Sequence, residues 1–274
     1  MTGIVLFAGG EAGRIAAERL AAMAPCCLSA MVWDHQTGPA PEIEGIGLVD
    51  EERAADCGDT LFCSGYGSII GPTVLAHFGA RAFNAHPSLL PAYRGRHAIQ
   101  WAIAKGEAVM GVTIHRLTSA IDHGEILAQE AWEFGAETSL PQVAACLASV
   151  AATMLCDLAA ALARGEEPAA RQTPAALPYW RRRRASDSAV DWAAPAAAII
   201  NQVRAGGPGY WAKARRRDGS EVRFLAHKAG GAPGTVLLST PQGCLVSTVT
   251  GVVWLVPDRP LIEGEVLGDG DATA

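Results

Sequence analysis

The opening segment IVLFAGGEAGRIAAERLAAM constrains the fold of this chain more than any other feature of the sequence. Ile4 to Ala8 form an apolar run of strand length, and apolar residues at helical spacing follow the glycine-rich turn Gly9 to Gly13. The pattern predicts a strand, a tight turn and a helix. The glycines are spaced GGxxG and not GxGxxG, so close packing of the helix on the sheet competes with phosphate binding as their role.

The alternation of strands and helices continues beyond this unit. Further elements are predicted at Leu28 to Trp33, Thr60 to Ser64, Pro72 to Phe78 (a helix), Arg81 to Asn84, Val109 to Leu117, Ile126 to Phe134 and Leu140 to Arg164 (a long Ala-rich helix). Such alternation predicts an α/β fold with a Rossmann-like, doubly wound, mostly parallel sheet. Ligands of such sheets bind at the carboxyl ends of strands, which here are Ser64 to Ile70 and Asn84 to His86.

The C-terminal part follows a different pattern. The segment GEEPAARQTPAALPYW has three Pro and no periodicity, which is typical of a linker. Short strands separated by Gly and Pro come later and predict a small OB-like β-barrel. The predicted domains are therefore a catalytic domain at 1–165, a linker at 166–190 and a barrel at 191–274.

Composition restricts the class of protein. The 274 residues are 50% hydrophobic, which is enough for the cores of one large and one small domain. No apolar run approaches the 18 or more residues that a membrane span needs, and the start resembles no signal peptide. Seven Cys without a CxxC pair indicate reduced thiols and a cytoplasmic protein. The net charge of −6 disfavours general nucleic-acid binding, although the basic runs Arg181 to Arg184 and Lys213 to Arg217 keep it open.

Asn84 and His86 are the first candidates for chemistry. They lie two residues apart at the end of a predicted strand, so their side chains point to the same side. An imidazole can move a proton near neutral pH, and an uncharged amide can donate a hydrogen bond to a developing oxyanion. Each also has a structural alternative: a His at a strand end commonly serves as a hydrogen-bonding residue of the fold, and an Asn there can cap the strand.

Asp122 is the third candidate, in the turn IDHGE between two predicted strands. A carboxylate close to His86 would favour the imidazolium form and orient the ring. Turns of this kind also favour Asp for local backbone hydrogen bonds, and the sequence leaves both roles open. The nearby residues His115, His123 and Glu125 cluster in sequence but are expected to be exposed, so no metal is predicted.

The order of these motifs resembles the signature of the 10-formyltetrahydrofolate-dependent formyltransferases. The segment FNAHPSLLPAYRGRHAIQW carries Asn-x-His, Ser-Leu-Leu-Pro and an Arg-Gly turn, and IDHGE supplies Asp-x-Gly. The resemblance covers roughly Thr60 to Glu130. It implies that Asn84, His86 and Asp122 are the catalytic residues and that 10-formyltetrahydrofolate is the formyl donor. Further residues are implied to bind the folate: Ser68, Ile69, Ile70, Arg96, Thr118, Ser119, Ala120 and Ile121.

The acceptor is a primary amine, and three classes stay open. YWRRRRASDSAVDW and the Arg-Gly-Arg turn resemble enzymes that formylate the amine of a nucleotide-linked sugar, although His97 and Ala98 replace the usual Ala-Pro. A basic C-terminal barrel is typical of methionyl-tRNA formyltransferases, but Asp187, Asp191 and Asp218 interrupt the basic runs. Another small amine, such as hydroxyornithine, is the third class.

Two other functions remain to be distinguished from transfer. A formyltetrahydrofolate hydrolase would use the same His and Asp with water as nucleophile, but such enzymes usually carry an N-terminal regulatory module, whereas here the catalytic domain is expected to begin at Met1. A folate or nucleotide sensor would not need the three catalytic residues. The sequence leaves a homodimer open.

Overall fold

The computed structural model describes residues 3–23, 27–166, 169–172, 178–207, 210–216, 218–229, 236–240, 243–248, 251–262, 265 and 267. Contacts divide the chain into two compact units. Unit one comprises Met1–Gly95, Val109–Glu133 and Val143–Tyr179, and unit two comprises Arg96–Ala108, Phe134–Gln142 and Trp180–Ala274. The division into functional domains at 1–165, 166–190 and 191–274 stays a prediction, and parts of the expected linker and barrel lie outside the described residues.

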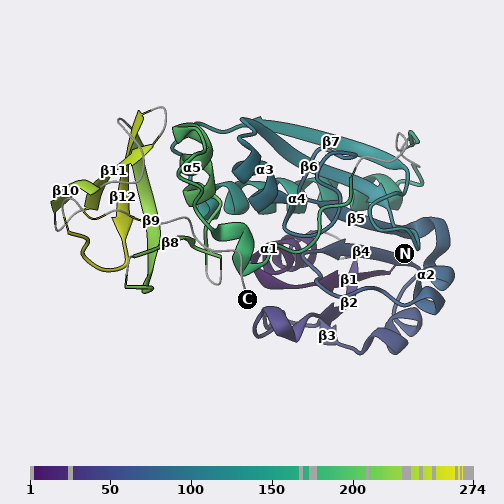
Figure 1. Ribbon diagram of the computed structural model, residues 1–274. Coiled ribbons are helices and arrows are strands. Elements are labelled where there is room, and N and C mark those ends of the chain that lie inside the picture. Colours follow the sequence, from purple (N-terminus) through teal and green to yellow (C-terminus); the bar gives the residue numbers. More distant parts are fainter. Residues whose placement is uncertain are drawn as a thin grey trace. The chain divides into compact units, whose positions relative to one another are not determined.

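Unit one is built on a seven-stranded sheet with the order β3-β2-β1-β4-β5-β6-β7 (Figure 1). The strands are β1 (Ile4–Ala8), β2 (Leu28–Trp33), β3 (Gly47–Leu48), β4 (Thr60–Ser64), β5 (Ala82–His86), β6 (Val109–Arg116) and β7 (Ile126–Glu133). Strands β1 to β5 are parallel, whereas β6 and β7 pair antiparallel. The predicted Rossmann-like, mostly parallel sheet is confirmed. All five residues of β1 are buried, as expected of a central strand covered on both faces.

The helices of unit one begin and end where local chemistry favours it. Helix α1 (Gly10–Ala21) packs on β1, β2 and β4, and α2 (Pro72–Phe78) starts with Pro, which suits the first helical turn. A Cβ at Gly13 would lie 2.9 Å from the Ala8 Cβ and 3.1 Å from the Ser64 carbonyl oxygen. The close packing expected of the GGxxG glycines therefore accounts for Gly13.

Helix α4 (Leu140–Ala163) has the length and composition of a membrane span, so the expectation that no segment would reach that threshold was wrong. Its most apolar window is 56% buried within the protein, which is typical of a core helix. On its partly exposed side, the Arg19 guanidinium of α1 donates hydrogen bonds to Ser149 and Thr153. These polar contacts tie α4 to the first βα unit.

One core cluster of unit one lies on the β1, β2 and β4 strands and includes residues of α2. One buried cluster consists of Val5, Phe7, Ala30, Val32, Ala54, Leu61, Cys63, Ile70, Val74, Phe78 and Ala82. Each of these strands contributes residues two positions apart, whose side chains lie on the same face of the sheet. One face of the sheet therefore provides most of the cluster.

Unit two contains a five-stranded antiparallel sheet with the order β10-β11-β12-β9-β8. Its strands are β8 (Ala212–Arg215), β9 (Glu221–Ala229), β10 (Val236–Thr240), β11 (Gly243–Thr248) and β12 (Gly251–Pro257). Helix α5 (Ala196–Arg204) packs on β9, β12 and a further helix, α3 (Ala98–Lys105), to which the sequence analysis assigned no element. The small β domain is confirmed, and its closure into a barrel stays a prediction.

Candidate active site

The two candidate residues at the end of β5 lie beside a strand that contributes a third. Asn84 is opposite His115 and His86 is opposite Thr113 in the antiparallel pairing of β5 and β6. Directly paired residues on antiparallel strands have side chains on the same face, so Asn84, His86, His115 and Thr113 line one side of the sheet. Strand β5 extends to His86, two residues beyond the predicted end at Asn84.

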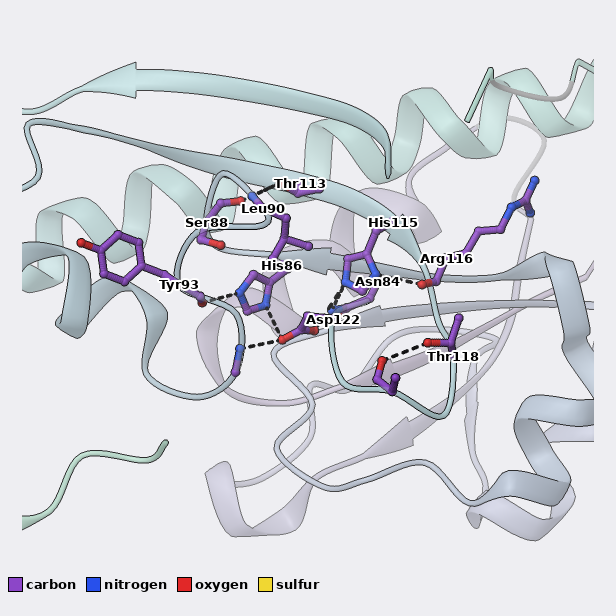
Figure 2. A network of polar contacts seen from close by, with 12 residues as sticks. Asn84, His86, Ser88, Leu90, Tyr93, Thr113, His115, Arg116, Thr118 and Asp122 are labelled. Carbon is purple, nitrogen blue, oxygen red and sulfur yellow. Dashed lines mark hydrogen bonds and ion pairs between the residues drawn. The ribbon is translucent and has the colours of Figure 1, made fainter. Parts of the chain in front are cut away.

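His86 is enclosed between a carboxylate and a main-chain carbonyl (Figure 2). Its side chain is buried, with 5% of the residue exposed. The Nδ1 atom lies 3.6 Å from Asp122 Oδ2, and Nε2 lies 3.1 Å from the carbonyl oxygen of Tyr93. Both ring nitrogens thus face acceptors, an arrangement that suits the doubly protonated imidazolium.

Asp122 combines the two roles that the sequence left open. It adopts a left-handed backbone conformation with φ of 53° in the turn between β6 and β7, a conformation that Asp tolerates better than most residues. At the same time its carboxylate points to the two imidazoles: Oδ1 lies 3.5 Å from His115 Nε2, and Oδ2 accepts a hydrogen bond from the Gly95 N–H at 2.8 Å. The turn therefore presents the carboxylate to His86.

His115 is a site residue that the sequence analysis missed. It was expected to be exposed, and that expectation was wrong, since only 1% of it is exposed. Its Nδ1 lies 2.8 Å from the Arg116 carbonyl oxygen and carries a proton there, so Nε2 accepts from the Asn84 amide at 3.0 Å when the ring has that single proton. This contact fixes which end of the Asn84 side chain carries the N–H groups.

The environment sets the protonation states of the pair. Burial lowers the pKa of His86, and the Asp122 carboxylate offsets only part of this effect, so the ring is neutral at pH 7 and can accept a proton. Burial alone would raise the pKa of Asp122, but His86, His115 and the Gly95 N–H together lower it to about 2. The site therefore combines a neutral base with a permanent negative charge.

The residues implied to bind folate occupy two loops of unit one and one position of unit two. Ser68 and Ile69 are exposed in the loop after β4, whereas Ile70 is buried. The stretch 118–121 is exposed in the turn that carries Asp122, and the Thr118 hydroxyl donates to the Ala120 carbonyl at 2.9 Å. Arg96 begins unit two, with an exposed side chain and its N–H donated to the Trp180 carbonyl.

The two other residues weighed as metal ligands have ordinary surroundings. His123 is partly exposed, and Glu125 forms an ion pair with Arg116 at 3.2 Å and accepts a hydrogen bond from Gln172. Across the described part of the chain, no group of three or more His, Cys, Asp or Glu has the arrangement of a metal site.

Two sequence profiles match this chain. The family described as "Formyl transferase" matches residues 48–158, a range that includes Asn84, His86, His115 and Asp122. The family described as "Formyl transferase, C-terminal domain" matches residues 183–259. Together the two matches cover more than half of the chain.

Solved structures of similar fold were also found. An N-formyltransferase from Helicobacter canadensis, in complex with folinic acid and dTDP-3-aminofucose, has a TM-score of 0.76 at 14% identity and covers 94% of this chain and 100% of its own. WlaRD, a sugar 3N-formyl transferase in the presence of dTDP and 5-N-formyl-THF, has a TM-score of 0.74 at 15% identity, covering 95% and 99%. HypX from Aquifex aeolicus, in complex with tetrahydrofolic acid, has a TM-score of 0.66 at 17% identity, covering 98% of this chain and 46% of HypX. At these identities the likeness establishes the fold.

Proposed function

Because the chain belongs to the formyl transferase family, we propose that it transfers the formyl group of 10-formyltetrahydrofolate to the primary amine of a nucleotide-linked amino sugar. The observation that carries this proposal is the convergence of Asn84, His86 and Asp122, from a strand and a distant turn, on one face of the sheet. A neutral buried base beside a fixed carboxylate and an oriented amide is suited to acyl transfer between two bound partners.

The three side chains have separate roles in the proposed reaction. Asn84 donates an N–H to the formyl oxygen as negative charge develops there, a contribution of about 3 kcal/mol in comparable sites. His86 accepts the proton that the amine loses when its nitrogen bonds to the formyl carbon, and returns it to the folate nitrogen as the old C–N bond breaks. Asp122 and the Tyr93 carbonyl stabilise the imidazolium between these steps, since each faces one ring nitrogen.

His115 acts through Asn84 and is therefore a positioning residue. Because its Nε2 accepts one amide N–H, Asn84 cannot turn its carbonyl oxygen toward the developing oxyanion without losing that bond. The amide has a second N–H, for which the described residues provide no acceptor, and this N–H is available to the formyl oxygen.

The donor is proposed to bind between the loop at 68–70 and the turn at 118–122 of unit one, and a role of Arg96 in folate binding stays a separate prediction. Ile69 and Ile121 are large apolar residues with exposed fractions of 79% and 43%, and a flat ring system would cover such surface. The structures of similar fold support this donor, because the H. canadensis and WlaRD enzymes were solved with folinic acid or 5-N-formyl-THF, and HypX with tetrahydrofolic acid. The bound folate supplies the formyl group itself.

The acceptor proposal is supported by similar structures of sugar-modifying enzymes, one of them solved with dTDP-3-aminofucose. The described cysteines, Cys27, Cys57, Cys63, Cys146, Cys156 and Cys244, form no disulfide with one another, which fits the cytoplasm that we propose as the location. Neither observation bears on a homodimer, which stays a prediction.

An acceptor panel tests the function directly. The purified protein is incubated with 10-formyltetrahydrofolate and, separately, dTDP- and UDP-linked amino sugars, charged initiator tRNA, hydroxyornithine or no acceptor, and both tetrahydrofolate and the formamide product are measured. We expect formamide with an amino-sugar nucleotide. Transfer to tRNA or hydroxyornithine alone would reassign the acceptor, release of folate without any amine would indicate a hydrolase, and no turnover of any kind would indicate a sensor.

A further inference from the structure

Unit two contains a group of basic residues whose positive charges are only partly balanced by nearby carboxylates. We name Arg96, His97, Arg182, Arg183 and Tyr210 the cationic cluster. Arg182 donates its Nε–H to the Tyr210 hydroxyl at 3.3 Å, and the rings of His97 and Tyr210 meet edge to face at 5.2 Å. Because all five residues belong to unit two, the cluster is formed within one compact unit.

His97 is the centre of this cluster. It has a left-handed backbone conformation with φ of 58°, and its Nδ1 is buried without a hydrogen-bond partner among the described residues. Burial, together with the guanidinium groups of Arg182, Arg96 and Arg183, lowers the pKa of His97 to about 4. The neutral ring therefore offers an N–H donor and does not add a fourth positive charge.

The neighbouring carboxylate does not neutralise the cluster. Asp187 forms a two-pronged ion pair with Arg181, with both N–O distances 2.7 Å. Arg183 is only 2% exposed and is held by the carbonyl oxygens of Ala205 and Asp187 and the amide oxygen of Gln202, all neutral acceptors. A buried guanidinium without a paired carboxylate is costly, and an anion near it would offset that cost.

The aromatic residues next to the cluster pack against one another and against cationic side chains. Trp101 and Trp180 pack against each other at 5.0 Å, and Arg181 and Arg183 lie over the Trp101 ring at 5.6 and 5.3 Å. The Lys105 ammonium lies 5.7 Å from the centre of the Trp180 ring. These contacts add further cationic side chains around the cluster, which favours a negatively charged ligand.

We propose that Arg182, His97 and Tyr210, with the buried charge of Arg183 behind them, bind the diphosphate of the acceptor nucleotide. The inference rests on the proposed function, since it names the part of the acceptor that this cluster binds. Arg182 has further guanidinium N–H groups for which the described part of the chain provides no acceptor, and the Tyr210 hydroxyl, which accepts from Arg182, still has its own proton to donate. Phosphate oxygens are the acceptors that such charged donors bind best.

Binding measurements with the full chain test the inference. Isothermal titration calorimetry is performed with three ligands: dTDP, inorganic pyrophosphate and 5-formyltetrahydrofolate. The proteins are the wild type, Arg182→Gln, Arg182→Lys and His97→Asn. Asn is chosen at position 97 because it tolerates the left-handed backbone conformation. Arg223→Gln is the matched control, since it removes an exposed guanidinium that is paired with Glu221 elsewhere in unit two. Circular dichroism confirms that each variant is folded.

We expect pyrophosphate to compete with dTDP, and Arg182→Gln and His97→Asn each to weaken dTDP binding at least about tenfold, with Arg182→Lys intermediate because a single ammonium replaces a fork of donors. Arg223→Gln should bind dTDP as the wild type does, and 5-formyltetrahydrofolate affinity should be unchanged in every variant. Wild-type dTDP affinity in Arg182→Gln overturns the inference. So does a loss confined to 5-formyltetrahydrofolate, which would assign the cluster to the carboxylates of the donor.

The acceptor panel separates failure of this inference from failure of the proposed function. Formamide production with an unchanged KM for the sugar nucleotide in Arg182→Gln would refute the cluster and leave the function standing. Binding of dTDP through Arg182 by a wild type that formylates no amine would refute the function and leave the cluster standing as a diphosphate site.

Discussion

Replacing Asp122 by Asn tests how the site makes His86 a base. The substitution removes the negative charge that lies 3.6 Å from His86 Nδ1 but keeps the size of the side chain, an oxygen for the Gly95 N–H, and a residue that tolerates φ of 53°. The fold should therefore survive, and the change in activity reports the charge.

The size of the effect follows from the distance. Two unit charges about 4 Å apart attract by about 4 kcal/mol at an effective dielectric constant of about 20, and because His86 is buried little of this is screened by solvent. That energy corresponds to roughly three pKa units. We expect the pKa of His86 to fall further and turnover to drop by about a hundredfold or more, because the imidazolium formed during transfer loses its counter-ion.

The pH profile of kcat/KM shows in which direction the pKa of His86 changes. His86 must be neutral to accept a proton, so wild-type activity is lost as the pH falls through its pKa. A lower pKa moves this acid limb to lower pH in Asp122→Asn, while the plateau falls. Glu125→Gln is the control, since it removes a carboxylate from the same turn region that is paired with Arg116, and it should leave the limb in place. An unshifted limb in Asp122→Asn would refute the electrostatic role and leave Asp122 with a turn role alone.

Three further predictions concern the site and its support. His86→Ala and Asn84→Ala should each reduce turnover at least about a hundredfold with an unchanged melting temperature, and near-normal turnover in either would contradict the mechanism. His115→Gln should lower kcat about tenfold with little change in KM for the amine, because the Asn84 amide loses its fixed orientation; a purely structural role would instead lower the melting temperature at unchanged kcat. Gly13→Ala should lower the free energy of unfolding by about 1–3 kcal/mol in chemical denaturation, because overpacking at 2.9 Å outweighs the roughly 1 kcal/mol gain in helix propensity. Gly47→Ala is the control and should be close to neutral, because no described atom lies within 4 Å of the added Cβ.

The local elements could be predicted because their signals are local. Residues 4–8, 28–33, 60–64 and 72–78 were assigned from runs of apolar residues and from Pro, and the structure has elements with these bounds. Helix α3 was not predicted because its eight residues give only about two turns, which is too short for a clear helical periodicity.

The site could be predicted only in part. Asn84 and His86 share a strand, and alternation along a strand places residues two apart on the same side whatever surrounds them. His115 is 31 residues from Asn84 in sequence, and only the pairing of β5 with β6 puts the two side chains together. The position of His115 near the end of an apolar strand indicates a candidate site residue. It does not indicate which strand lies beside it.

The sequence by itself therefore determined many of the elements of unit one, the shared face of Asn84 and His86, and, through motifs in order, a resemblance to formyltransferases. The tertiary structure decided that the carboxylate of Asp122 reaches His86, that His115 orients Asn84, and that Arg182, His97 and Tyr210 form one cluster. The physical reason is separation along the sequence. Backbone geometry and burial patterns depend on residues a few positions apart. The contacts that set charge and orientation at a site join distant segments, which come together only when the strands of the sheet pair.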